Sequence, residues 1–135
     1  MTDTSTIEGG CLCGNIRYRI TGQPKDATHC HCTTCRKASG AAFVTWSSIH
    51  RDNFKWLGEK PMNYRASEIA YRGFCSHCGT HLTFCYNNQP DWIAFTAASL
   101  DDPSAITPGA HIWTKSRLPW LKLDDHLPEF KEDNE

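Results

Sequence analysis

The grouping of cysteines is the feature that most constrains how this chain can fold. Seven of its eight cysteines lie in three short groups: Cys11-Leu12-Cys13, the three in 30–35, and the two in 75–78. Such close spacing suits metal chelation, and a closed tetrahedral zinc site takes four thiolates. Seven cysteines therefore fill one such site and leave three cysteines over. A catalytic or ligand-exchanging zinc, called the working zinc below, needs three protein ligands and an open fourth position. The spacing predicts one structural and one working metal.

The residues that flank the cysteines predict which of them share the structural site. Residues two apart on a regular strand have Cα atoms about 7 Å apart, so Cys11 and Cys13 can share an ion only where the chain bends. Glycines on both sides of this pair allow such a bend. Cys75 and Cys78 form a Cys-x-x-Cys-Gly turn. Joining the two pairs closes a long loop, where a crosslink restricts the unfolded chain most, so we expect these four cysteines to hold a structural zinc.

The central group supplies three local ligands, Cys30, Cys32 and Cys35, for a second zinc. An open zinc site lowers the pKa of a bound water or thiol to near neutrality and so produces a nucleophile. We therefore interpret these three cysteines as the ligands of the working ion. The sequence leaves the fourth ligand open, with these candidates: water, a substrate thiol, Cys85, His29, His31, His77 and His81.

Charged and polar neighbours of the central group are candidates for supporting roles. Arg36 and Lys37 lie one turn from the thiolates, where they could steady the cluster or bind a carboxylate of a substrate. For Lys37, a solvated helix face is the competing interpretation. His29 and His31 adjoin the ligands and could donate hydrogen bonds to sulfur.

Three other uses of the cysteines compete with this division. Cys85 could complete a second closed site, although a lone cysteine in a strand pattern is more often a buried small hydrophobe. Cys32 and Cys35 could pair with Cys75 and Cys78 as a zinc ribbon, but their separation exceeds the usual spacer of about 15–20 residues. Eight cysteines could also form disulfides, which the absence of an export signal disfavours.

Composition limits the size, the compartment and the partners. The 135 residues predict a single domain over 9–130, with flexible tails at 1–8 and 131–135. A net charge of −1 argues against nucleic acid or an anionic membrane as partner. No apolar run approaches the roughly 18 residues of a membrane span, and the polar first residues do not resemble a signal peptide. We expect a cytoplasmic protein, in which thiols stay reduced.

The hydrophobic pattern predicts a mainly β fold with short helical turns. Apolar and polar residues alternate over 15–20, and β-rich runs cover 42–46, 81–86 and 92–97, with Leu82, Phe84 and Tyr86 on one face. Weaker strand candidates cover 53–57 and 69–74. The one persuasive helix spans 33–39 and ends at Gly40, and a turn could follow Pro103. Many short strands joined by turn residues indicate small sheets pinned by metal.

The motifs resemble those of the family of glutathione-dependent formaldehyde-activating enzymes, which includes centromere protein V. The resemblance rests on Gly10-Cys11-Leu12-Cys13-Gly14, on the stretch from Cys30 to Gly40, on Phe74-Cys75-Ser76-His77-Cys78-Gly79-Thr80, and on the stretch from His111 to Trp120. Together these elements cover roughly residues 8–130. Three cysteine motifs in matching order make the resemblance specific.

This resemblance implies a fold of several small, coiled β-sheets similar to the Mss4-like class, and two zinc ions divided as the spacing divides them. It also implies a carbon–sulfur lyase, with a glutathione thiol or its adduct as small-molecule partner and S-hydroxymethylglutathione as product from formaldehyde. Arg36 could then hold a glutathione carboxylate. The alternatives are a non-catalytic, zinc-stabilised binding module and a thiol or metal sensor.

Overall fold

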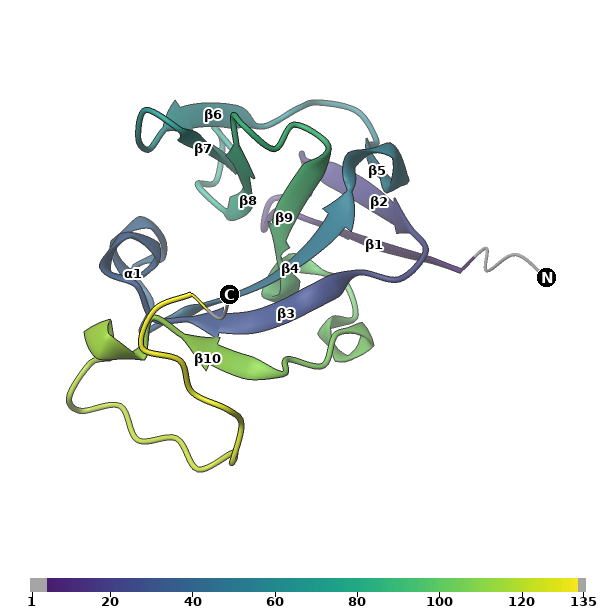
Figure 1. Cartoon of the computed structure of the whole chain (residues 1–135). Coiled ribbons are helices and arrows are strands. Elements are labelled where there is room, and N and C mark those ends of the chain that lie inside the picture. The colour runs from purple at the N-terminus through teal and green to yellow at the C-terminus, as the bar shows by residue number, and fades with distance from the viewer. Residues whose placement is uncertain (1–4, 134–135) are drawn as a thin grey trace.

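Two β-sheets make up most of the fold in the computed structural model, which describes residues 5–133 (Figure 1). The smaller sheet has the order β1 (Thr6–Gly10), β2 (Arg17–Thr21), β5 (Phe54–Trp56). The larger sheet has the order β10 (Ala110–Ile112), β3 (Lys25–Cys30), β4 (Val44–His50), β9 (Trp92–Thr96), β8 (His81–Tyr86), β7 (Ala70–Phe74), β6 (Met62–Arg65). Neighbouring strands are antiparallel except β10 and β3. The predicted mainly β fold with more than one sheet is confirmed.

The main core lies where the small sheet packs against the large one. Ile16, Tyr18 and Ile20 are all fully buried, as their alternation predicts. The Tyr18 ring stacks on Phe54 of β5 with 5.1 Å between centroids, and lies 6.2 Å from Phe95 of β9. Large buried aromatic rings supply much of the apolar area of a small core. These contacts therefore join the two sheets into one hydrophobic unit.

A register shift in β8 changes which of its side chains share a face. The β7–β8 pairing shifts between Gly73 and Phe74, as at a β-bulge. Leu82 is fully buried in the main core with Cys85, whereas Phe84 packs against a second, smaller core. An extra residue in one strand reverses the alternation beyond it. The expectation that Leu82 and Phe84 lie on one face is therefore wrong.

Helical structure in the described residues is short. The α-helix α1 (Thr33–Ser39) matches the predicted helix and ends at Gly40, which adopts the left-handed conformation at a φ of 68°. Four single-turn 3₁₀ helices follow along the chain: η1 (Arg51–Asn53), η2 (Ala97–Ser99), η3 (Pro103–Ala105) and η4 (Thr114–Ser116). Among the described residues, no helix is both long and apolar enough to cross a membrane.

The ends of the chain contribute more structure than the sequence predicts. β1 begins at Thr6, within the stretch assigned to the N-terminal tail, and pairs with β2. Near the other end, the carbonyls of Lys131 and Glu132 accept hydrogen bonds from the amides of Lys115 and Trp113. Residues 1–4 and 134–135 lie outside the described part of the chain. The flexibility of both tails stays a prediction.

Candidate metal centres

The four cysteines predicted for the structural zinc lie together. The sulfurs of Cys11, Cys13, Cys75 and Cys78 are all within 4.8 Å of one another. Those of Cys11 and Cys13 are 3.6 Å apart, and those of Cys13 and Cys75 are 3.8 Å apart. A tetrahedron with zinc–sulfur bonds of about 2.3 Å places its sulfurs about 3.8 Å apart. The donor set and its spacing therefore fit a zinc ion.

Two similar turns present these four sulfurs. In each turn the amide of the first cysteine, Cys11 or Cys75, donates to the carbonyl five residues later at 3.0 Å. A glycine follows the second cysteine, and Gly14 and Gly79 both have a φ of 80°. A side chain is strained in this left-handed region, which explains the glycine in each motif. Both cysteine pairs of this cluster therefore lie in turns that bring their two sulfurs to one side.

Hydrogen bonds to sulfur favour the thiolate form that a metal needs. The amide of Ile16 donates to the sulfur of Cys11 at 3.2 Å. The sulfur of Cys78 lies 3.2 Å from the hydroxyl oxygen of Thr80. Hydrogen bonds from the side chain and then the backbone of Thr80 lower the pKa of Cys78 to about 5. Local backbone geometry thus prepares this cluster to bind a cation.

The three central cysteines form a second cluster at the junction of β3 and α1. Cys30 is the last residue of β3, Cys32 is the N-cap of α1, and Cys35 lies in the first turn of the helix. Their sulfurs lie within 4.8 Å of one another, and the Cys32 sulfur accepts the amide hydrogen of Cys35 at 3.2 Å. A thiolate at a helix N-cap satisfies a free amide and is itself stabilised. The N-cap therefore positions two ligands at once.

Two donors from outside the cluster contact the sulfur of Cys35. This sulfur accepts from Trp46 Nε1 at 3.4 Å and from Arg72 Nη2 at 3.6 Å. Hydrogen bonds from Cys30 and Cys32, and then from Trp46 and Arg72, lower the pKa of Cys35 to about 2. The same proximity of Cys32 and Cys35 raises the pKa of Cys30. The cluster thus has a thiolate that the surrounding protein already stabilises.

None of the predicted protein candidates for the fourth ligand joins this cluster among residues 5–133. Cys85 lies in the main core, where Arg51 Nη2 donates to its sulfur at 3.1 Å. His77 belongs to an exposed ion pair. His81 Nε2 lies 3.4 Å from Arg72 Nη1. Among the described residues, this cluster therefore consists of three sulfurs.

His29 and His31 lie in a separate polar group with His111 and Asp125. His31 Nε2 is 2.8 Å from His111 Nδ1, and His111 Nε2 is 2.7 Å from an Asp125 oxygen. Because the carboxylate only accepts, His111 donates to Asp125 from Nε2; in the neutral form of His111, Nδ1 then accepts the hydrogen that His31 donates from Nε2. This chain of hydrogen bonds spans 80 residues between its two histidines. Through His31, these hydrogen bonds fix the segment between Cys30 and Cys32.

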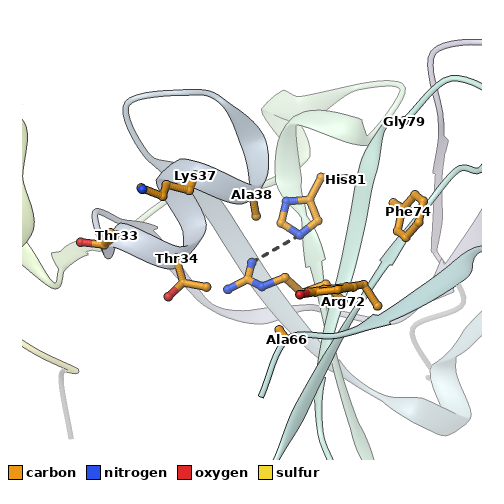
Figure 2. A pocket seen from close by; sticks show the side chains of 10 residues that line it. Thr33, Thr34, Lys37, Ala38, Ala66, Arg72, Phe74, Gly79 and His81 are labelled. Carbon is orange, nitrogen blue, oxygen red and sulfur yellow. Dashed lines mark hydrogen bonds between the residues drawn. The ribbon is translucent and has the colours of Figure 1, made fainter. Parts of the chain in front are cut away.

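A cavity of about 660 Å³ lies beside the second cluster. Side chains of α1, including Lys37, form one wall, and Arg72, Phe74 and His81 form the other (Figure 2). Arg72 both lines this cavity and contacts Cys35. No cysteine of the described chain lines the cavity, so the guanidinium is the link between the cavity and the cluster.

The two predicted cationic residues differ in position. Lys37 lines the cavity, although its amine points away from Arg72 (Figure 2). Arg36 does not line it, and its Nε is buried without a hydrogen-bond partner in the described structure. Sequence reasoning missed Arg72, His111 and Asp125. In the sequence, the only signal for Arg72 is a charged residue within the otherwise apolar and small stretch 70–74. The structure shows that this position is buried.

Comparisons with known proteins agree with this structure. The fold and the two sulfur clusters define a mainly β protein with candidate metal centres. Residues 6–116 match the family described as glutathione-dependent formaldehyde-activating enzyme, and the chain belongs to this family. The resemblance seen in the motifs is therefore confirmed.

Two individual proteins extend the comparison. A relative from Schizosaccharomyces pombe, described as an uncharacterized lyase, is 35% identical over 81 residues, which is 60% of this chain and 58% of the relative. The match thus spans little more than half of the relative's length. A crystal structure of a Rhodobacter sphaeroides protein has a TM-score of 0.60 at 19% identity, and the match covers 76% of this chain and 92% of that one. This second protein shares the fold.

Proposed function

We propose that this chain is a zinc-binding carbon–sulfur lyase that acts on glutathione or a glutathione–aldehyde adduct. Family membership and the lyase description of the S. pombe relative support this class of reaction. The observation that carries the proposal is the cluster of Cys30, Cys32 and Cys35, which gains no fourth protein ligand from the described residues. Arg72 connects this cluster to a cavity large enough for a small-molecule thiol.

The two sulfur clusters have different roles in this proposal. The cluster of four cysteines holds a structural zinc that ties the N-terminal part of the chain to β7 and β8. The cluster of three holds the working zinc, which when bound supplies a positive charge that lowers the pKa of an incoming thiol. The sulfur spacing and donor set described above support both assignments.

The reaction forms one bond between sulfur and carbon. The thiol of glutathione loses its proton, the sulfur attacks the carbonyl carbon of formaldehyde, and the carbonyl oxygen takes up a proton, giving S-hydroxymethylglutathione. The reverse reaction cleaves the same bond. The chain orients the thiol in the cavity, and Lys37, which lines this cavity, is the candidate to bind a carboxylate of glutathione. Arg36 is a weaker candidate for such a contact because it does not line the cavity.

Native mass spectrometry with and without glutathione tests this function together with NMR detection of S-hydroxymethylglutathione. We expect two zinc ions per chain, a change at one of them when glutathione is added, and faster adduct formation than without protein. Cys35→Ser should keep the fold and one zinc but lose the activity, whereas the control Cys85→Ser should keep both ions. Two ions with no response to glutathione and no turnover would support a non-catalytic binding module instead.

A further inference from the structure

Arg72 is a buried cation that has no carboxylate partner among residues 5–133. Only 6% of the residue is exposed, although its guanidinium is charged at any physiological pH. None of the ion pairs in the described part of the chain includes Arg72. Buried charges are costly unless they are paired or hydrogen-bonded. The charge of Arg72 therefore requires another negative group nearby.

The surroundings of Arg72 identify that group as sulfur. Nη2 lies 3.6 Å from the Cys35 sulfur, and Nη1 lies 3.4 Å from His81 Nε2. Because arginine only donates, His81 accepts at Nε2 and is neutral in this contact. The guanidinium also lies 4.9 Å from the centroid of the Phe84 ring, which favours a cation. Neutral groups thus hold Arg72 in place, and the thiolates provide its counter-charge.

Charge arithmetic shows what Arg72 adds to the second cluster. Three thiolates and one divalent ion leave one net negative charge, and a fourth sulfur anion raises it to two. Without a nearby cation, this second negative charge would oppose the entry of an anionic ligand. Arg72 is fixed against the cluster and lines the cavity, where it can attract that ligand. Arg72 is therefore positioned to compensate the additional negative charge that the thiolate ligand brings to the cluster.

We propose that Arg72 is the charge partner of the three-cysteine cluster and makes this cluster selective for a ligand that binds as a thiolate. The inference rests on the proposed function and adds to it the ionic form of the ligand and the residue that selects it. His81 acts through Arg72, as a positioning residue. Other residues of the cavity bind the carboxylates of the ligand.

Cobalt(II) in place of zinc gives this proposal a readout that is independent of activity, because its visible spectrum reports the ligands at the metal. Titration with glutathione should change the spectrum of the wild-type chain. Arg72→Gln should weaken this binding roughly 10- to 100-fold, the factor expected for losing one charge several ångströms from another at an effective dielectric constant of about 20. Arg72→Lys, which keeps the charge, should recover part of the affinity.

Matched controls separate this effect from general ones. Arg65→Gln removes the same charge from the exposed strand β6, where Arg65 donates hydrogen bonds to the backbone carbonyls of Ser67 and Glu68, and should leave glutathione binding unchanged. S-methylglutathione, which cannot become a thiolate, should bind Arg72→Gln as it binds the wild type. Circular dichroism and retention of the metal at the four-cysteine cluster verify the fold of each variant.

The outcomes distinguish this inference from the proposed function. Equal glutathione affinity in wild type and Arg72→Gln would overturn the role of Arg72 while leaving the lyase proposal intact. Equal losses for glutathione and S-methylglutathione would also overturn it, since Arg72 would then bind the peptide. If the wild type binds 2-mercaptoethanol but not glutathione, the glutathione assignment fails. A loss of 2-mercaptoethanol binding in Arg72→Gln would then still support the role of Arg72.

Discussion

The four-cysteine cluster should contribute several kcal/mol to stability by crosslinking distant parts of the chain. The sulfurs of Cys13 and Cys75 lie 3.8 Å apart although 62 residues separate them in sequence. We treat a metal that holds both cysteines as a crosslink that also closes this loop in the unfolded chain, as a disulfide does. The double variant Cys13→Ser/Cys78→Ser removes the less buried cysteine from each pair, so it breaks the crosslink with little loss of packing.

The size of the effect follows from the length of the loop. Closing a loop of this length lowers the conformational entropy of the unfolded chain by an amount worth about 4 kcal/mol at 25 °C, by the relation used for disulfides. Domains of this size have unfolding free energies of about 5–15 kcal/mol. The double variant should therefore keep an unfolding free energy of about 1–11 kcal/mol, and chelation of zinc from the wild type should have a similar effect.

Urea denaturation followed by circular dichroism measures this difference. The control Cys85→Ser makes the same chemical change outside both clusters and should cost about 1 kcal/mol, as typical point substitutions do. A loss below about 1 kcal/mol in the double variant would refute the crosslink argument. So would a chelator that leaves the wild-type midpoint unchanged after it has removed both ions.

Three further substitutions test the packing and the electrostatics of the fold by the same denaturation assay. Gly73→Ala places a Cβ against the hydroxyl of Thr83 and should cost roughly 1–3 kcal/mol; an unchanged midpoint would show that β7 can move. His111→Leu removes both ring nitrogens from the buried hydrogen-bond chain and should cost about 1–3 kcal/mol, and no loss would mean that the chain is not formed. The hydrogen bond from Arg17 lowers the pKa of Asp101. This pair therefore stabilises the fold above the pKa that Asp101 has in the unfolded chain, and the stabilisation is lost as the pH falls below about 4. Asp101→Asn should make stability less dependent on pH in acid, and an unaltered pH profile would contradict the pairing.

Some features of the site were predictable because they depend on neighbours in sequence. The two turns that bend Cys11 toward Cys13 and Cys75 toward Cys78 require a following glycine, and each motif contains one. The helix that carries Cys35 also follows from local signals, since Gly40 ends it in the left-handed conformation. Short-range backbone geometry depends on residue type, which is why the sequence alone predicts which cysteines lie together.

Other features depended on strand pairing, which residue type specifies weakly. β3 contains charged and polar residues, so its sequence did not predict a strand, yet it pairs with β4 and β10 and carries Cys30. The bulge in β8, opposite the end of β7, decided that Leu82 joins Cys85 in the main core. Neither outcome can be derived from period-two alternation, because a shift of one residue reverses the faces of a strand.

By itself, the sequence determined a mainly β chain with four cysteines in one group and three in another, because chelating turns are local and have fixed glycine requirements. Only the tertiary structure decided that Arg72 of β7 contacts Cys35 of α1, and that Asp125 supports the turn before Cys32 through two histidines. These contacts join segments far apart in the chain. Their positions follow from sheet order and register, which form only when the whole core packs.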